Sequence, residues 1–182
     1  MLVYRKSGPP WNAALKCSES TQQRFAALLD EHHKIVFKVA NIYANGVDDR
    51  ADLAQEISAQ LWRAFPKYDA QRSFSTWMYR IALNVGISFL RSHARHAENA
   101  VALDETLHDC ADDNAADPSA EQQLRLLDGF IAKLAPLDRA LLLLYLEDHR
   151  QAQIADIFGI SESNVATKVS RLKQRIRNHI GN

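Results

Sequence analysis

Hydrophobic residues recur at steps of three and four over most of this chain, the spacing that places them on one face of an α-helix. One run begins near Thr21 and ends at an Asn-Gly pair, and a second covers residues 48–65 and stops at a proline. A third run covers Ser73–Arg95, where the Ser73 hydroxyl can cap the first turn. No run alternates with the period of two that marks a β-strand. The first half of the chain is therefore predicted to be a three-helix bundle.

The helical spacing returns in the last third of the chain. It resumes at Leu124 and continues past Pro136 to Leu146. Residues 151–158 then form a short helix, a Gly-Ile pair forms a turn, and residues 161–179 form a long basic helix. A short helix, a glycine turn and a capped longer helix in this order are typical of a helix-turn-helix. The fold class is predicted to be all-α, with two small helical domains joined by a flexible acidic linker.

Composition predicts where the domains begin and end. Residues 1–20 contain glycine and a Pro-Pro pair and show no periodicity, so we expect a flexible lead-in. Residues 21–96 form the first domain. Residues 97–119 form the linker, because acidic and small side chains dominate there. Residues 120–182 form the second domain.

The 182-residue chain has a formal net charge of zero, but its charges are segregated. Residues 63–95 hold six basic side chains and one acidic one, and residues 97–120 hold seven acidic side chains without Lys or Arg. Residues 162–182 hold five basic side chains and one acidic one. The polar face of the helix over 73–95 carries no carboxylate, which fits nucleic acid, an acidic protein or a membrane surface. That face consists of Arg80, Asn84, Ser88, Arg91 and Arg95.

Several other classes of protein are disfavoured. The two cysteines, Cys17 and Cys110, indicate a reducing compartment rather than a disulfide framework. No apolar run approaches the roughly 18 residues of a membrane span, and the N-terminus lacks the apolar core of a secretory signal, so we expect a cytoplasmic protein. Gly-rich phosphate loops, nucleophile elbows and paired catalytic carboxylates do not occur. We therefore expect neither an enzyme nor a cofactor.

One group of residues comes nearest to a metal site. His93 and His96 lie at a predicted helix end, whereas His108 and Cys110 lie in the acidic segment. Sequence spacing of this kind specifies no coordination geometry. We predict no metal.

The second helix of the helix-turn-helix is a candidate for reading DNA. Ala155 is small where two helices approach closely, and Gly159 permits the positive φ of the turn. The helix that follows presents polar side chains near its start, as a recognition helix does in a major groove, and later basic residues can meet phosphate. The alternative is a solvated basic helix in an ordinary bundle. The outward side chains are Glu162, Ser163, Asn164, Thr167, Lys168 and Arg171.

Short motifs in both halves point to one known family. In the first half they are Asp52-Leu53-Ala54-Gln55-Glu56, Leu61-Trp62, Phe65, Tyr68-Asp69, the run from Phe74 to Asn84, and Leu90-Arg91. In the second half they are Leu134-Ala135-Pro136-Leu137-Asp138-Arg139, Ile154-Ala155, Gly159-Ile160-Ser161 and Asn164-Val165. With these motifs the chain resembles a bacterial sigma factor of the extracytoplasmic-function type, a minimal member of the sigma-70 family. The resemblance covers about Phe25–Arg95 and Leu124–Ile180.

The resemblance implies a role for each part. The first domain would bind core RNA polymerase and would recognise and melt the promoter −10 element, and the second would bind the −35 element. The linker would pass through the polymerase active-centre cleft and RNA exit path, and the alternative that it is only a charged disordered spacer stays open. An anti-sigma factor is a further implied partner. The implied core-polymerase contacts are Asp52, Gln55 and Glu56. The implied −10 contacts are Lys67, Tyr68, Asp69, Gln71, Arg72, Arg80, Asn84, Arg91 and Arg95. The implied −35 contacts are Ser163, Asn164, Thr167, Lys168, Arg171, Lys173 and Arg175.

Three hypotheses on function remain open from the sequence. The chain is a sigma factor, or a polymerase-independent helix-turn-helix regulator with residues 21–95 as a sensor, or an adaptor that binds only protein. The acidic patch beside a basic helix favours the first, because a sensor domain does not need both. Trp77 is interpreted as a core residue rather than a stacking platform for bases, because it lies on the apolar stripe.

Overall fold

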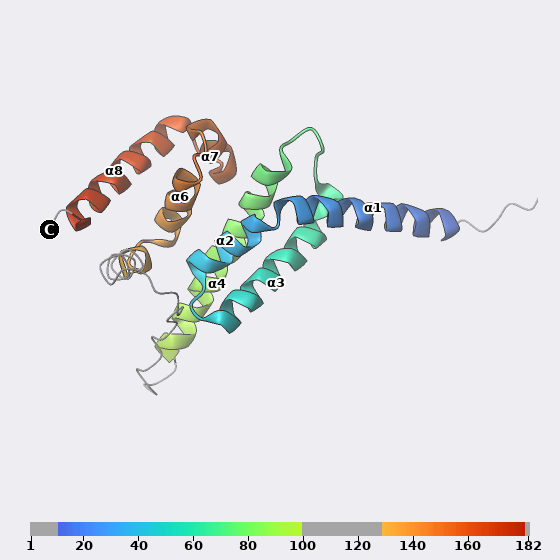
Figure 1. The fold of residues 1–182 in the computed structure, drawn as a ribbon, viewed down its shortest axis with the longest axis horizontal. Helices are drawn as coiled ribbons and strands as arrows, with labels where there is room; N and C mark the ends of the chain where they lie inside the picture. The colour runs from blue at the N-terminus through green and yellow to red at the C-terminus, as the bar shows by residue number, and fades with distance from the viewer. Residues whose placement is uncertain (1–10, 100–128, 181–182) are drawn as a thin grey trace, which may run out of the picture. The chain divides into compact units, whose positions relative to one another are not determined.

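The computed structural model describes residues 11–99 and 129–180 (Figure 1). Its helices are α1 (Trp11–His32), α2 (Lys34–Tyr43), α3 (Val47–Ala64), the 3₁₀ helix η1 (Phe65–Lys67), α4 (Phe74–Asn99), α6 (Pro136–Leu146), α7 (Gln151–Phe158) and α8 (Glu162–Ile180). Residues 129–132 are also helical. The described residues contain no strand, and the all-α prediction is confirmed. None of the helices in the two described ranges is long and apolar enough to cross a membrane.

The beginning of the chain differs from the sequence-based prediction in two ways. The predicted flexible lead-in over 1–20 is wrong for residues 11–20, because α1 already begins at Trp11. The first ten residues lie outside the described part. Helix formation in this segment is favoured by the good helix formers Ala13, Ala14, Leu15 and Lys16 and by the absence of further Gly or Pro.

The helix predicted from Thr21 to the Asn-Gly pair is divided at His33. The His33 N–H donates to the Asp30 carbonyl, three residues back, instead of continuing the α-helical pattern. The chain separates into two compact units at this point, residues 1–33 and 34–182. Periodicity did not reveal this break, because the hydrophobic spacing continues through it.

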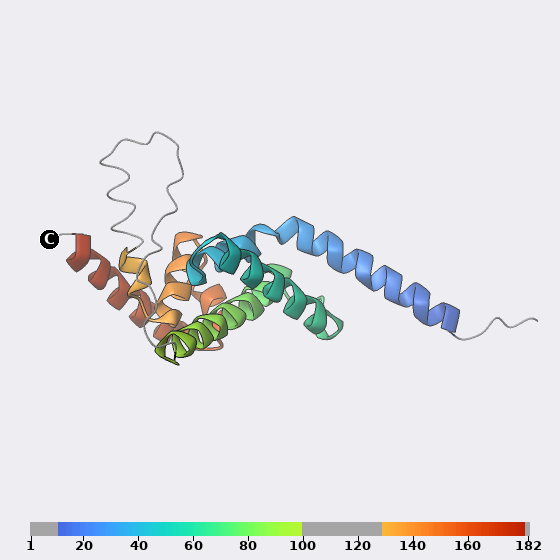
Figure 2. The same ribbon diagram turned by 90° about the horizontal axis from the view of Figure 1, so that it is seen from below.

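Helices α2, α3 and α4 pack against one another and form the predicted bundle (Figures 1 and 2). Leu53, Ile57 and Leu61 of α3 recur at helical spacing and are buried, and Phe65 of η1 is buried with them. Gly86 of α4 lies directly against Tyr43 of α2, so the two helices approach closely at that point. The fully buried residues of this core include Val39, Leu53, Ile57, Leu61 and Met78.

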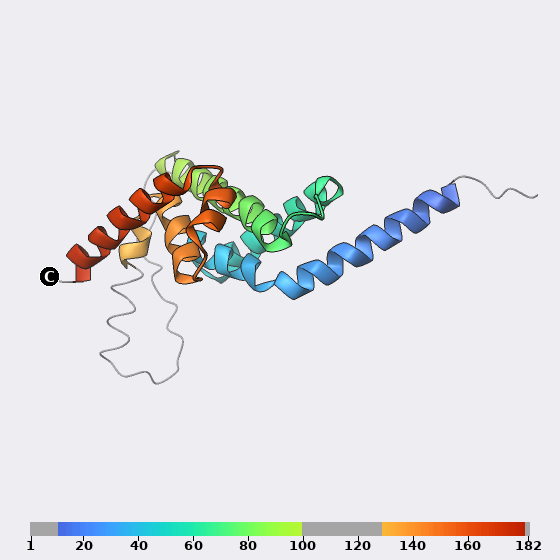
Figure 3. The ribbon, with the colours of Figure 1, turned by 90° about the horizontal axis from the view of Figure 1, so that it is seen from above.

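Helices α6, α7 and α8 form the predicted helix-turn-helix and its supporting helix (Figure 3). Gly159 ends α7 in the left-handed conformation, with φ of 66°, which a residue without Cβ adopts at little cost. The Ser161 Oγ accepts a hydrogen bond from the Asn164 N–H at 3.3 Å and so caps α8. Ile154, Val165 and Leu172 are buried between the helices. The predicted order of short helix, glycine turn and capped helix is confirmed.

Within residues 34–182, α6 contacts α2 and α4, and α7 contacts α4. The Tyr43 hydroxyl donates to the Pro136 carbonyl at 2.7 Å, and Lys38 pairs with Glu147. Burial raises the pKa of Tyr43 above its ordinary value, which keeps the hydroxyl protonated as a donor. These contacts join sequence segments about a hundred residues apart, which no local pattern predicts.

A second group of contacts at this junction involves an aromatic pair. The Tyr79 ring meets the His149 ring edge-on, with centroids 5.0 Å apart. Burial, with a smaller contribution from Glu147, raises the pKa of Tyr79 to about 12. Burial also lowers the pKa of His149, although Glu147 nearby opposes that effect. Both shifts follow from packing and favour the neutral forms of the two rings.

The predicted linker over 97–119 begins too early. Helix α4 continues to Asn99, so residues 97–99 are helical rather than part of a linker. Residues 100–128 lie outside the described part of the chain, and the linker prediction for them stays a prediction.

Candidate nucleic-acid interface

The polar face of α4 is the first candidate surface. Arg80, Asn84 and Arg91 are all exposed, and their spacing of four and seven residues places them on one side of the helix. Arg95 lies further along the same helix, and its side chain is outside the described part. Between Phe74 and His93 the helix has no acidic residue. The Asp49 carboxylate of α3 lies 4.0 Å from the His93 ring.

The loop between η1 and α4 is the second part of this surface. Lys67, Asp69, Gln71 and Arg72 are exposed, whereas Tyr68 is half-buried. A tight turn closes from the Asp69 carbonyl to the Arg72 N–H at 3.0 Å. The Asp69 carboxylate also accepts the Gln71 N–H at 3.0 Å. Four of the predicted −10 residues are thus exposed, three on the turn itself and Lys67 just before it.

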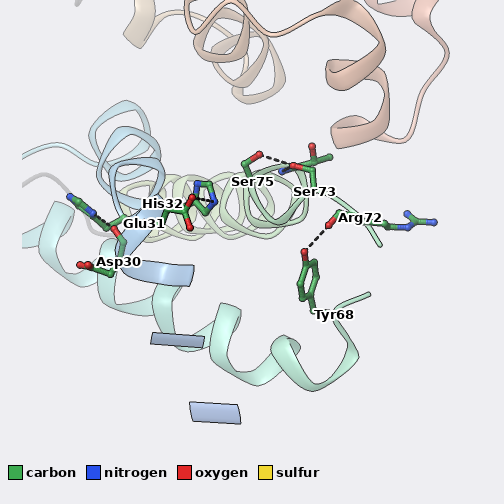
Figure 4. Close-up of polar contacts among 9 residues, drawn as sticks. Asp30, Glu31, His32, Tyr68, Arg72, Ser73 and Ser75 are labelled. Carbon is green, nitrogen blue, oxygen red and sulfur yellow. Dashed lines mark hydrogen bonds and ion pairs between the residues drawn. The ribbon is translucent and has the colours of Figure 1, made fainter. Parts of the chain in front are cut away.

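The N-terminus of α4 follows this turn. The Ser73 Oγ accepts the Thr76 N–H at 3.5 Å, in agreement with the predicted cap, and also contacts the Ser75 hydroxyl at 2.8 Å (Figure 4). A shallow pocket at this end is lined by Arg72, Ser73, Thr76, Trp77, Arg80 and, from α7, Asp156. The sequence did not indicate Asp156, because it comes from the other half of the chain.

Aromatic side chains pack beneath the loop. Phe65 and Phe74 are buried, and the rings of Tyr68 and Trp77 lie against them. The Trp77 ring is 5.2 Å from the Phe74 ring and 5.0 Å from the Tyr68 ring, centroid to centroid. Trp77 therefore contributes to packing, as its place on the apolar stripe predicted.

The candidate polymerase-binding patch lies on α3. Asp52, Gln55 and Glu56 are exposed on neighbouring turns. Glu56 accepts a hydrogen bond from Gln60 at 2.7 Å and lies 3.7 Å from Arg63. Trp62, which was not among the predicted contacts, is 42% exposed and lies seven residues after Gln55. Its position two turns beyond Gln55 on the same helix face was the signal that could have indicated it.

Helix α8 carries the third candidate surface. Ser163, Asn164, Thr167, Lys168 and Arg171 are exposed on its first three turns. The Thr167 hydroxyl donates to the Ser163 carbonyl at 2.9 Å, which orients that side chain along the helix.

Two predicted −35 residues have partners within the same domain. The Lys173 ammonium lies 4.7 Å from the centre of the Tyr145 ring. The Arg175 guanidinium donates to the Asp138 carboxylate at 2.7 Å. Both partners belong to α6. Lys173 and Arg175 therefore differ from the five exposed residues at the start of α8 in having interactions with another helix.

Within residues 11–99 and 129–180, no group of three His, Cys, Asp or Glu side chains is arranged to hold a metal ion. The His93 ring packs instead against Phe89, with centroids 3.9 Å apart. His108 and Cys110 lie outside the described residues.

Comparison with known families assigns both halves. Residues 28–96 match the model for Sigma-70 region 2, and residues 124–176 match the model for Sigma-70, region 4. The chain belongs to the sigma-70 family. These matches cover the two helical groups described above and leave the acidic segment between them. Proteins of this family are generally non-catalytic DNA-binding regulators.

Relatives indicate the branch of the family. The chain is 30% identical, over 87% of its length, to a protein of Xanthomonas campestris pv. campestris described as "Probable RNA polymerase sigma factor RfaY", of which it spans 41%. It is 24% identical, also over 87% of its length, to the "ECF RNA polymerase sigma factor SigW" of Bacillus subtilis, of which it spans 90%. The chain is thus a sigma-70 family factor of the extracytoplasmic-function type.

Solved structures share the fold. The chain is similar to CnrH in complex with the cytosolic domain of CnrY, with a TM-score of 0.65 at 18% identity, covering 92% of this chain and 94% of that one. It is also similar to the sigma factor RpoE of Bartonella quintana in complex with the anti-sigma factor NepR, with a TM-score of 0.62 at 16% identity, covering 90% and 98%.

Proposed function

We propose that this chain directs core RNA polymerase to specific promoters and initiates transcription there. The observation that carries the proposal is the pair of exposed polar and basic helix faces, on α4 and on α8. Each lies in one of the two matched family regions. A polymerase-independent regulator would need the α8 surface but not the α4 surface or the acidic patch on α3.

The α3 patch is proposed to bind the polymerase. Asp52, Gln55 and Glu56 present two carboxylates and an amide to solvent on neighbouring turns. Such a patch fits a partner surface with complementary basic side chains. Trp62 on the same helix would add apolar contact area of the kind enriched at protein interfaces.

The loop and α4 are proposed to recognise and melt the −10 element. An unstacked base needs a pocket or polar partners that offset the cost of a few kcal/mol for flipping it. Lys67, Tyr68, Asp69, Gln71 and Arg72 would surround that base. Residues further along α4, namely Arg80, Asn84, Arg91 and Arg95, would hold the adjoining phosphates and duplex edge.

Helix α8 is proposed to read the −35 element in the major groove. Ser163, Asn164 and Thr167 would face base edges, and Lys168 and Arg171 would meet base edges or phosphate. Lys173 and Arg175 would contact phosphate on exchanging their α6 partners for DNA. Promoter binding would take place in the cytoplasm, where RNA polymerase and the chromosome are. Regulation would come from an anti-sigma protein that covers these surfaces.

Run-off transcription tests the proposed function directly. Purified chain is combined with core polymerase and a library of promoter fragments, and core binding is measured separately. We expect promoter-specific transcripts that depend on the chain. Failure to bind core, or to start transcription at any promoter, would contradict the proposal.

The double variant Arg80→Ala, Asn84→Ala tests the assignment of α4. We expect at least about tenfold slower open-complex formation, because hydrogen bonds to charged groups contribute about 1.5–3 kcal/mol each. Core binding should be retained. The matched control is Arg177→Ala, Asn178→Ala, which removes an exposed Arg and Asn from the end of α8. Lost core binding in the first variant would mean that the helix faces are assigned wrongly.

A further inference from the structure

Tyr68 holds the loop between η1 and α4 at two points. Its ring stacks on Phe65, with centroids 5.9 Å apart and planes at 18°, and meets the edge of Phe74 at 5.3 Å. Its hydroxyl donates to the carbonyl of Arg72 at 2.6 Å (Figure 4). The side chain thus fixes the end of the turn to the aromatic core beneath it.

The backbone that Tyr68 spans is the tight turn of the proposed −10 loop. One end of the turn is Asp69, whose carbonyl and carboxylate both accept backbone N–H groups of the turn. The other end is Arg72, whose carbonyl accepts the Tyr68 hydroxyl. The N–H groups of Gln71 and Arg72 and the carbonyls of Asp69 and Arg72 are therefore used within the loop, and the side chains of Gln71 and Arg72 are exposed.

The chemistry of Tyr68 differs from that of its neighbours in the loop. Its ring is half-buried in the aromatic cluster, and its one polar atom is engaged with backbone. A group in this position is poorly placed to read a base itself. It is well placed to fix the direction in which the exposed side chains of the turn project. How well such side chains discriminate among bases depends on how precisely they are positioned.

We propose that Tyr68 is a positioning residue for −10 recognition. Through its hydroxyl bond to the Arg72 carbonyl it fixes the Asp69–Arg72 turn, so that Gln71 and Arg72 discriminate among bases. The inference rests on the proposed promoter function and replaces, for Tyr68 alone, direct contact with an unstacked base.

The test begins with Tyr68→Phe, which removes the hydroxyl and keeps the ring in its cluster. Holoenzyme is formed with core polymerase, and open-complex formation is measured on promoters that differ at single −10 positions. We expect the preference for the best base at the loop-contacted position to fall by about two- to tenfold, the range set by one net hydrogen bond. Binding to core polymerase should change little. The thermal unfolding temperature of the variant should also stay close to that of the wild type, because the ring remains in the aromatic cluster.

The control is Tyr43→Phe, which removes a tyrosine hydroxyl that also donates to a backbone carbonyl, at 2.7 Å. This variant should keep wild-type base preference. A general loss of stability would affect both variants alike, whereas a positioning role affects only the one at the loop. Equal base preference in Tyr68→Phe and wild type would overturn the inference.

Double-mutant cycles separate positioning from direct contact. If Tyr68 acts through the turn, its effect disappears in the background of Gln71→Ala or of Arg72→Ala. Full additivity in both backgrounds would mean that Tyr68 contacts DNA by itself, and the inference would be wrong. A wild-type holoenzyme that opens no promoter would overturn the proposed function and this inference with it. A wild type that discriminates, with an unchanged Tyr68→Phe, would overturn the inference alone.

Discussion

At the scale of the residue, Arg139 shows how one side chain can bind backbone carbonyls of several segments. Its guanidinium donates to the Leu134 carbonyl at 3.2 Å and to the Ile42 carbonyl at 3.4 Å, and it also contacts the Ala132 carbonyl. Burial lowers its pKa below the ordinary value of arginine. Ile42 and Ala132 lie in the last turns of their helical segments, where carbonyls have no partner within the helix, so a planar donor with several N–H groups suits this site.

Arg139→Ala is expected to lower the free energy of unfolding by about 1–3 kcal/mol, because hydrogen bonds from a charged donor to these carbonyls are lost. Urea denaturation followed by circular dichroism measures the change. Arg150→Ala is the control, since Arg150 is an exposed arginine ahead of α7. Equal midpoints for the two variants would show that the carbonyls are satisfied by water instead.

At the scale of the element, the basic side chains of α8 fall into two groups that differ in their contacts. Lys168 and Arg171 are exposed along the helix, whereas Lys173 and Arg175 interact with Tyr145 and Asp138 of α6. In the sequence all four residues look alike, because each contributes one positive charge. Packing against α6 distinguishes them, because only some of them have a partner within reach.

Lys168→Ala tests this division. If Lys168 neutralises one phosphate of duplex −35 DNA, the slope of log affinity against log salt should fall by about 0.9. The slope is obtained from binding titrations of the holoenzyme at several salt concentrations. Lys133→Ala, which removes an exposed lysine outside α8, should leave the slope unchanged. The same reduction in both variants would point to a general charge effect rather than a contact.

At the scale of the whole molecule, long-range packing depends on a close approach of α2 and α4. A Cβ added at Gly86 would lie 2.5 Å from the Tyr43 ring. That ring is only 2% exposed, and its hydroxyl is held by the Pro136 carbonyl. The ring cannot move aside without disturbing contacts in both halves of the chain.

Gly86→Ala is therefore expected to destabilise the protein by about 1–3 kcal/mol, the usual cost of overpacking a core. Gly129→Ala is the matched control, because a Cβ there would meet nothing within 4 Å and alanine favours a helix. Thermal melts of the two variants give the comparison. A Gly86→Ala protein as stable as wild type would mean that the helices separate at little cost.

Much of the fold follows from local pattern. The spacing of apolar residues predicted α3, α4, α7 and α8, and serine hydroxyls at 73 and 161 accept the predicted capping hydrogen bonds. The start at Trp11 and the break at His33 were missed. In the first case helix propensity outweighed the absence of periodicity, and in the second the periodicity continued across a break in hydrogen bonding.

The sequence by itself determined the all-α class, the helix-turn-helix and the basic faces of α4 and α8, because helix periodicity and charge are local properties. Only the tertiary structure decided the partners of individual side chains. It directs the Tyr68 hydroxyl to the Arg72 carbonyl, engages Lys173 and Arg175 with α6, and places Asp156 in the lining of the same pocket as Arg80. The contacts with α6 and the approach of Asp156 join residues far apart in the chain, which no spacing along the sequence encodes. The Tyr68 bond spans only four residues, but it depends on how the turn folds over the aromatic core.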